Sequence, residues 1–190
     1  MSKRQLGPTT NLFPMPAVLV AVKTGEDAAN VLTVAWCGIV GGAPPMMALE
    51  IGQNHYSTPF IDREGCFTVN VPNSSQAVGV DYCGMVSGAT DPRKPATCGW
   101  TLAPATQISA LLIVECPLNL ECRIVRKVEA GGGVFYLVEI VETHVDEAAL
   151  ATPKRIDAAA LDPLIFTADG FYHKLGPRIG KAWQMGKALQ

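Results

Sequence analysis

The chain has 190 residues, of which 48% are hydrophobic and only 17% are charged. This length and composition predict a single folded domain over residues 1–190 with a sizeable core, and they exclude a disordered or coiled-coil chain. Fifteen basic and seventeen acidic side chains give a net charge of −2. No strong positive field is therefore present to attract nucleic acid or an anionic membrane surface.

The apolar runs at 17–22 and 111–114 are much shorter than the roughly 20 residues of a membrane-spanning helix. No long apolar stretch follows residues 1–8 that would form a secretory signal, so we interpret the protein as cytoplasmic. Six cysteines occur without a Cys-x-x-Cys motif, and we expect reduced, mostly buried thiols rather than disulfides or a metal site. They are Cys37, Cys66, Cys83, Cys98, Cys116 and Cys122.

Six segments have the length and β-branched content of strands, at 17–22, 31–36, 46–51, 66–71, 117–125 and 134–145. Glycine-containing segments at 25–27 and 131–133 are typical of hairpin turns. The helical candidates are short, at 58–64, with Pro59 in the first turn, and from 74 or 75 to about 85. The pattern predicts a mainly β fold, an antiparallel barrel with peripheral helices.

Two further segments have an unusual composition. Residues 87–103 are rich in Gly, Pro, Thr and charge and are too long for a simple turn, and such loops are usually functional or mobile. Residues 169–190 combine Tyr172, His173 and Trp183 with polar neighbours. We expect this C-terminal segment to pack on the barrel or on a partner subunit.

The first candidate site is the strand from Asn30 to Trp36, which runs into Cys37, Gly38 and further glycines. Small residues at this point allow a flat ligand to approach the backbone closely. The alternative is a core strand that ends in a glycine turn. The residues alone leave both interpretations open.

The second candidate site is the polar run Gln53, Asn54, His55, Tyr56 and Ser57, between a predicted strand and a predicted helix. Backbone N–H groups at a helix start, together with hydroxyl groups, can bind a phosphate. The alternative is that Ser57 or the next residue caps the helix while His55 lies on the surface.

Other chemistries have little support in the sequence. The chain lacks a Gly-x-Ser-x-Gly motif, its three histidines fit no triad spacing, and no metal-ligand cluster is visible. The glycines at 131–133 precede a predicted strand rather than a helix, which excludes a dinucleotide-binding fingerprint, and no Walker motif is present.

The order of these motifs resembles the flavin reductase-like family, and its flavoredoxin branch most closely. The resemblance extends from about residue 6 to 180. It is carried by Asn30-x-x-Thr33-x-Ala35-Trp36, Pro44-Pro45, His55-Tyr56-Ser57, the segments 67–72, 81–88 and 120–122, Asp91, Lys94, and Tyr172-His173-x-Leu175-Gly176.

The resemblance implies a six-stranded antiparallel FMN-binding split barrel of Greek-key type that forms a homodimer, with FMN near the dimer interface. It assigns the flavin ring to the backbone of Thr33, Val34, Ala35 and Trp36, with Asn30 and Cys37 beside them. It assigns the ribityl phosphate to Gln53, His55, Tyr56 and Ser57, and a second phosphate or ribityl element to Ser87, Gly88 and Lys94.

Three roles within this set stay open. The spacing of residues 91–95 departs from the family pattern, so Arg93 is an alternative to Lys94 at the phosphate. Cys37 is either a redox-active thiol beside the flavin or a small apolar filler. Trp36 either stacks on the ring or belongs to the core.

The resemblance implies an FMN-dependent NAD(P)H:flavin oxidoreductase in which hydride reaches flavin N5 and electrons pass on to oxygen, another flavin or a protein acceptor. Since the cofactor carries this chemistry, no catalytic side chain and no metal are required. The alternative is a non-catalytic FMN electron carrier fed by a partner reductase. A third interpretation is a barrel that binds haem, through His55 or His173, or a deazaflavin, or that serves only as an interaction module.

Overall fold

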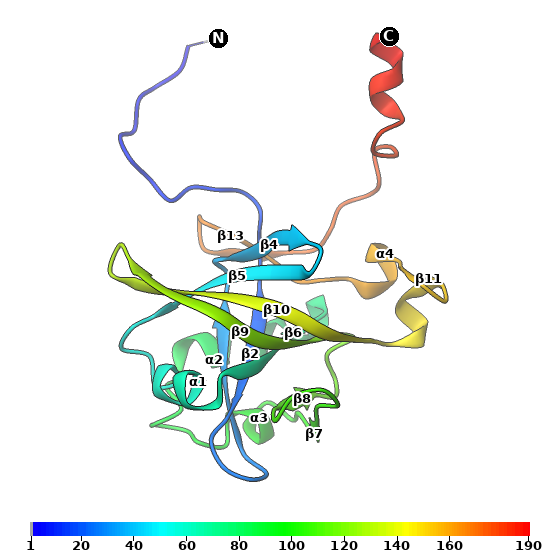
Figure 1. Cartoon of the computed structure of the whole chain (residues 1–190). Helices are drawn as coiled ribbons and strands as arrows, with labels where there is room; N and C mark the ends of the chain where they lie inside the picture. The colour runs from blue at the N-terminus through cyan, green and yellow to red at the C-terminus, as the bar shows by residue number, and fades with distance from the viewer. Residues whose placement is uncertain (1) are drawn as a thin grey trace.

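A seven-stranded sheet forms the centre of the fold, in the order β3-β2-β6-β9-β10-β5-β4 (Figure 1). The computed structural model describes residues 2–190. All neighbouring strands of this sheet are antiparallel, and β3 and β4 are its open edges. The strands are β2 (Val18–Lys23), β3 (Ala29–Val34), β4 (Cys37–Gly42), β5 (Pro45–Gly52), β6 (Cys66–Val71), β9 (Leu118–Ala130) and β10 (Gly133–Val145).

Six of these strands correspond to the six predicted segments, so the mainly β architecture is confirmed. The seventh strand, β4, is the part of the chain for which a glycine turn was the alternative interpretation, so the observed sheet has one strand more than the six predicted. β4 pairs with β5 from Cys37 opposite Leu49 to Gly42 opposite Pro45. Glycine has a low strand propensity, so pairing with β5 rather than local sequence makes this segment a strand.

The helices are short and peripheral, as predicted. They are α1 (Thr58–Glu64), η1 (Ser74–Gln76), α2 (Ala77–Met85), α3 (Lys94–Thr97), η2 (Glu147–Ala149), α4 (Ala158–Leu161) and η3 (Met185–Leu189). α1 ends at Gly65, whose φ of 66° is a left-handed conformation that favours glycine. Within residues 2–190 we find no helix whose length and apolar character would let it cross a membrane.

Small sheets complete the fold around the main one. β1 (Met15–Pro16), β13 (Ile165–Thr167) and β14 (Phe171–His173) form a three-stranded sheet, and two hairpins pair β7 (Leu102–Pro104) with β8 (Leu111–Ile113) and β11 (Leu150–Thr152) with β12 (Arg155–Ile156).

β2 separates two hydrophobic clusters because its side chains alternate between the two faces of the sheet. Val18, Val20 and Val22 pack with Phe67, Tyr136 and other barrel residues on one face. Leu19 and Ala21 pack on the other face with residues that include Val80 and Cys83 of α2. Burial of this second face holds α2 across the sheet and brings the C-terminal end of α2 beside β3.

A buried carboxylate ties the segment between β7 and β8 to the barrel. The fully buried Glu121 accepts hydrogen bonds from the backbone N–H groups of Thr106, at 2.6 Å, and Gln107, at 2.7 Å, and from His144 Nε2 at 2.7 Å. Burial by itself raises the pKa of Glu121, but these hydrogen bonds outweigh it and hold the pKa at about 2.

The two ends of the chain extend from the same side of the body in Figure 1. Residues 2–14 are exposed, and so are residues 173–190 beyond the pairing of β14 with β13. These ends carry large exposed apolar side chains, among them Leu12, Phe13, Ile179 and Trp183. Packing of the C-terminal segment on a partner subunit stays a prediction.

Candidate functional site

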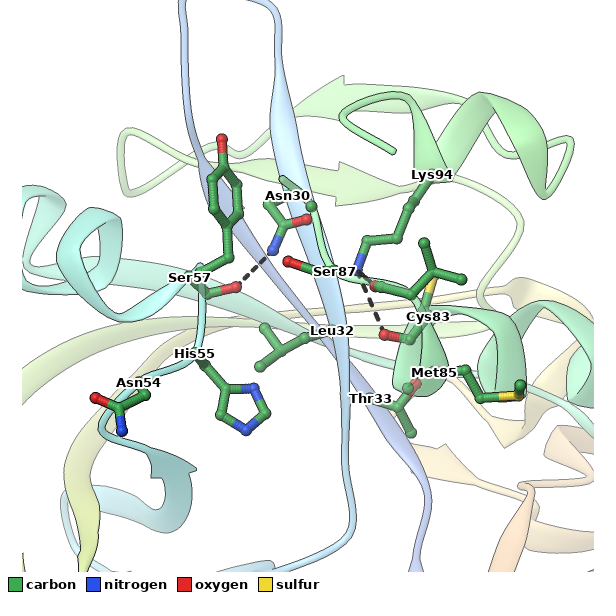
Figure 2. A pocket seen from close by; sticks show the side chains of 14 residues that line it. Asn30, Leu32, Thr33, Asn54, His55, Ser57, Cys83, Met85, Ser87 and Lys94 are labelled. Carbon is green, nitrogen blue, oxygen red and sulfur yellow. Dashed lines mark hydrogen bonds between the residues drawn. The ribbon is translucent and has the colours of Figure 1, made fainter. Parts of the chain in front are cut away.

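Two adjoining cavities lie along β3 and share Leu32, Thr33 and His55. The first has a volume of about 290 Å³ and lies between β3, the segment after β5 and the C-terminal end of α2 (Figure 2). The second has a volume of about 230 Å³ and follows the chain past the end of β3. The predicted sites around residues 30–36 and 53–57 therefore meet in one continuous region.

A hydrogen bond between Asn30 and Ser57 fixes the wall of the first cavity. Asn30 Nδ2 donates to Ser57 Oγ at 2.6 Å, and both side chains are buried (Figure 2). Ser57 precedes α1 but its side chain makes no capping hydrogen bond to that helix. The hydroxyl of Ser57 thus serves the cavity wall, and the interpretation of Ser57 as a mere helix cap is wrong.

The other amide atom of Asn30, Oδ1, is buried and has no hydrogen-bond partner within residues 2–190. A buried acceptor without a donor is costly, so this atom indicates a ligand or water that donates to it. Gly88 faces the same atom: a Cβ at Gly88 would lie 2.2 Å from Asn30 Oδ1 and 2.6 Å from Tyr56 Cδ1. Glycine at this position keeps the cavity open, which fits a bound polar ligand.

The His55 ring lies over Gly52 at the junction of the two cavities. A Cβ at Gly52 would be 2.5 Å from His55 Cδ2, so only glycine leaves room for the imidazole. The backbone N–H of His55 donates to Gly52 O at 3.0 Å, and Thr58 Oγ1 donates to the same oxygen at 3.0 Å. These bonds shape the turn that carries His55, Tyr56 and Ser57.

Lys94 contributes a buried positive charge to the first cavity. Its side chain is only 2% exposed, and Nζ donates to Val86 O at 2.8 Å and to Cys83 O at 3.4 Å. Burial lowers the pKa of Lys94 from its ordinary value. An ammonium group has three N–H bonds, so one donor remains for a ligand. Arg93 is exposed and does not line the cavity, so Lys94 is the better placed of the two cations.

The second cavity offers unpaired backbone donors. It is lined by residues 32–36, by Glu50, Ile51 and Gly52, and by His55. Ala35 and Trp36 lie between β3 and β4, and their N–H groups make no hydrogen bond in the described part of the chain. The Thr33 hydroxyl donates to Val80 O and joins β3 to α2. The cavity can therefore present main-chain donors to a flat ligand with acceptor atoms.

Cys37 lies outside both cavities, although it follows Trp36 directly. It lines a separate apolar groove together with Leu12, Pro14 and Met15 from the N-terminal segment. Burial raises the pKa of Cys37 to about 11. The thiol is therefore protonated near neutral pH, as expected for an apolar filler.

The cavities include residues that the sequence analysis did not select, and they omit Gln53 as well as Cys37. Gln53 is exposed in the turn after β5 and lines neither cavity, whereas its neighbour Asn54 lines the first. The end of α2, from Cys83 to Val86, forms the wall opposite the His55 turn. The segment 81–88, which contains this wall, carried part of the family resemblance and was the available signal.

Comparisons with known proteins identify the fold. A family model described as the flavin reductase like domain matches residues 10–174. Flavoredoxin from Methanosarcina acetivorans superposes with a TM-score of 0.92 at 30% identity over all of both chains. Flavoredoxin of Desulfovibrio vulgaris (Miyazaki F) superposes with a TM-score of 0.90 at 28% identity, over 97% of this chain and all of its own.

Among characterised sequences, an NADH-dependent FMN reductase from Streptomyces nodosus subsp. asukaensis is 27% identical over 138 residues, which cover 73% of this chain and 72% of its own. A protein of unassigned function from Archaeoglobus fulgidus is 32% identical over 136 residues, 71% of this chain and 75% of its own. The family model covers most of the described residues, and the predicted resemblance is confirmed. The chain belongs to the flavin reductase-like family and has its split-barrel fold.

Proposed function

We propose that the protein binds FMN in the two joined cavities and acts as an NAD(P)H-dependent flavin oxidoreductase. The observation that carries this proposal is the buried Oδ1 of Asn30, which finds no donor among residues 2–190 and faces the space that Gly88 leaves open. A ligand with hydroxyl groups, such as the ribityl chain of FMN, supplies the missing donor. Membership of the family and the likeness to an NADH-dependent FMN reductase also support the proposal.

The first cavity suits the ribityl phosphate. Lys94 supplies a positive charge, while the hydroxyls of Ser57 and Ser87 and the ring of His55 supply polar contacts. Charge-assisted hydrogen bonds to phosphate are stronger than neutral ones, so Lys94 is the main electrostatic contribution at this end. Gly88 leaves open the space beside Asn30 and Tyr56, so the phosphate end of the ligand can approach its backbone.

The second cavity suits the isoalloxazine ring. The unpaired N–H groups of Ala35 and Trp36 donate to ring acceptor atoms, and Thr33 and Val34 form the adjoining wall. When bound, FMN supplies the hydride and electron transfer chemistry, for which no catalytic side chain is needed. The chain's own residues orient the ring, donate hydrogen bonds to it and limit its access to water. Trp36 is 51% exposed, so its indole is available to cover the ring edge rather than to fill the core.

We propose that the protein is a homodimer whose interface borders the second cavity. Large apolar side chains of β4 and its approach, Trp36, Ile39 and Val40, are each more than half exposed. Trp36 also lines a groove of about 340 Å³ that shares Ala35 and Trp36 with the second cavity. A second copy of the chain would cover these groups. Light scattering after size exclusion tests this: a monomeric mass contradicts the proposal.

The test of function is the visible spectrum of the purified protein after addition of FMN, followed by anaerobic NADH and NADPH in separate samples. The oxidoreductase proposal expects that NADH or NADPH bleaches the bound flavin when no acceptor is present. After an acceptor is added, the protein should oxidise many equivalents of the same nucleotide. Absence of flavin binding contradicts both the cofactor and the function. A Soret band from added haem, in place of flavin absorbance, would redirect the search to haem.

An FMN electron carrier is the second candidate, and the high likeness to two flavoredoxins favours it. In this case the bound flavin stays oxidised with NADH and NADPH but is reduced by a chemical reductant such as dithionite. The two outcomes separate enzyme from carrier without knowledge of the natural acceptor.

A further inference from the structure

Two cysteines lie near Lys94, one of them in the wall of the first cavity and the other outside it. Cys83 belongs to α2 and is 2% exposed, whereas Cys98 directly follows α3 and is half-buried. Each thiol shifts the pKa of the other, which indicates that the two side chains are neighbours. They are thus a pair of neighbouring thiols, contributed by two separate helical segments.

The position of Gly79 shows how the two cysteine side chains come near one another. Cys98 Sγ donates to Gly79 O at 3.7 Å, and a Cβ at Gly79 would lie 3.3 Å from Cys98 Cβ. Gly79 is one helical turn before Cys83, and Cβ atoms in a helix lean toward its N-terminus. The Cys83 thiol therefore leans toward the place where the Cys98 thiol rests.

Lys94 connects the two segments that carry the cysteines. Its Nζ donates to Cys83 O at 3.4 Å, and the backbone N–H of Cys98 donates to Lys94 O at 2.9 Å. Both bonds restrict the relative motion of α2 and the turn after α3. The thiols are therefore held near one another instead of meeting only by chance fluctuation.

We propose that Cys83 and Cys98 form a redox-active dithiol that small disulfides oxidise to an intramolecular disulfide. Cys98 reacts first, because it lines a surface cavity of about 370 Å³ with Tyr82 and Trp100 whereas Cys83 is buried. The Cys98 thiolate attacks the small disulfide, forms a mixed disulfide and releases one thiolate. Cys83 then attacks Cys98 Sγ and releases the second thiolate. The two cysteines lose two electrons and two protons, and the small disulfide becomes two thiols.

The local charges agree with this order of attack. Burial, with a smaller effect of Asp91, raises the pKa of both thiols, and the pKa of Cys83 reaches about 12. The positive charge of Lys94 lowers both, and the interaction between the two thiols lowers the pKa of Cys98 while it raises the pKa of Cys83. Cys98 is therefore the thiol of the pair that is more easily ionised, and the thiolate is the attacking species.

The disulfide would join α2 to α3 around the intervening segment, which includes Ser87 and Gly88. A cross-link of this length restricts the unfolded chain and stabilises the folded protein. We expect the melting temperature to rise by about 5 °C on oxidation.

The experiment incubates the folded full-length protein with oxidised glutathione, counts the free thiols after denaturation and maps disulfides by tandem mass spectrometry. We expect loss of two of the six thiols, a Cys83–Cys98 link, a higher melting temperature, and full reversal by dithiothreitol. Cys98→Ser should retain all its remaining thiols, whereas the matched control Cys66→Ser, a buried cysteine outside the pair, should still form the link.

Several results would overturn the proposal: retention of all six thiols in the wild type, a different pair in the link, or a reaction that stops at glutathione on Cys98. Mapping of the wild-type protein decides these cases even if Cys98→Ser folds poorly. Because no step uses FMN, the result stands independently of the proposed function.

Discussion

Gly88→Ala is the substitution that tests the first cavity most directly. The added Cβ would lie 2.2 Å from Asn30 Oδ1, whose side chain is held by the bond from Nδ2 to Ser57 Oγ. Gly88 does not have a positive φ, so alanine brings crowding without backbone strain. Asn30 must turn away, which breaks the bond to Ser57 and removes its acceptor from the ligand. Loss of these two buried hydrogen bonds, one to Ser57 and one to the ligand, amounts to about 2 kcal/mol, or about a 30-fold rise in the Kd of FMN.

Fluorescence or calorimetric titration with FMN measures this effect, and circular dichroism checks that the variant remains folded. Gly25→Ala is the matched control, because its Cβ would make only ordinary contact, 3.6 Å, with Ala28 Cβ in the turn between β2 and β3. We expect unchanged affinity for this control. A folded Gly88→Ala protein that binds FMN within twofold of the wild type would refute the assignment of this cavity to the cofactor.

Lys94→Met should raise the Kd of FMN about tenfold, because a charge-assisted hydrogen bond is lost. Arg93 is exposed, so Arg93→Met should leave the Kd unchanged. Equal effects of the two substitutions in the same titration would contradict the role of Lys94. Glu121→Gln should lower the free energy of unfolding at pH 7 by about 2 kcal/mol. The folded-state pKa of Glu121, about 2, lies below its ordinary value of 4.5. The stabilisation by ionised Glu121 is therefore present above pH 4.5 and lost as pH falls toward 2. In this pH window the melting temperature should fall more steeply in the wild type than in Glu121→Gln. Parallel curves would show that Glu121 does not cause the loss of stability in acid. Asn70→Ala should lower the free energy of unfolding in urea by about 3 kcal/mol, because Asn70 makes buried hydrogen bonds with Leu19 O, Ile113 N and the Asn119 side chain. Asn11 is exposed, and Asn11→Ala is the control. A loss for Asn70→Ala no larger than for this control would contradict the prediction.

The elements with a strong local pattern were predictable from the sequence. Alternation in the segment 66–71 predicts β6 with the bounds observed, and the glycines at 131–133 predict the turn between β9 and β10. α1 was predictable because Pro59 favours a helix start and Gly65 ends the helix in a left-handed conformation. β4 was not predictable, since its glycines prefer turns and only the register with β5 makes them a strand.

The candidate site was only partly predictable. Asn30, His55 and Ser57 could be selected because polar residues stand beside strand or helix ends, and the structure brings them together in one cavity. The sequence placed Gln53 and Cys37 in the same set because they are neighbours of these residues, although neither lines the two cavities. Direction of a side chain near a turn depends on the backbone conformation there, which local sequence leaves undefined.

By itself, the sequence determined the period-two strands, the hairpin turns and the order of motifs that marks the family, because these depend on residues close together along the chain. Only the tertiary structure decided that the end of α2 forms a wall of the cavity, that Lys94 rather than Arg93 lines it, and that Cys98 lies near Cys83. These contacts arise because Leu19 and Ala21 of β2 bury one face of α2 and so fix the end of this helix against β3. Such packing joins residues far apart in the sequence, and no local pattern specifies it.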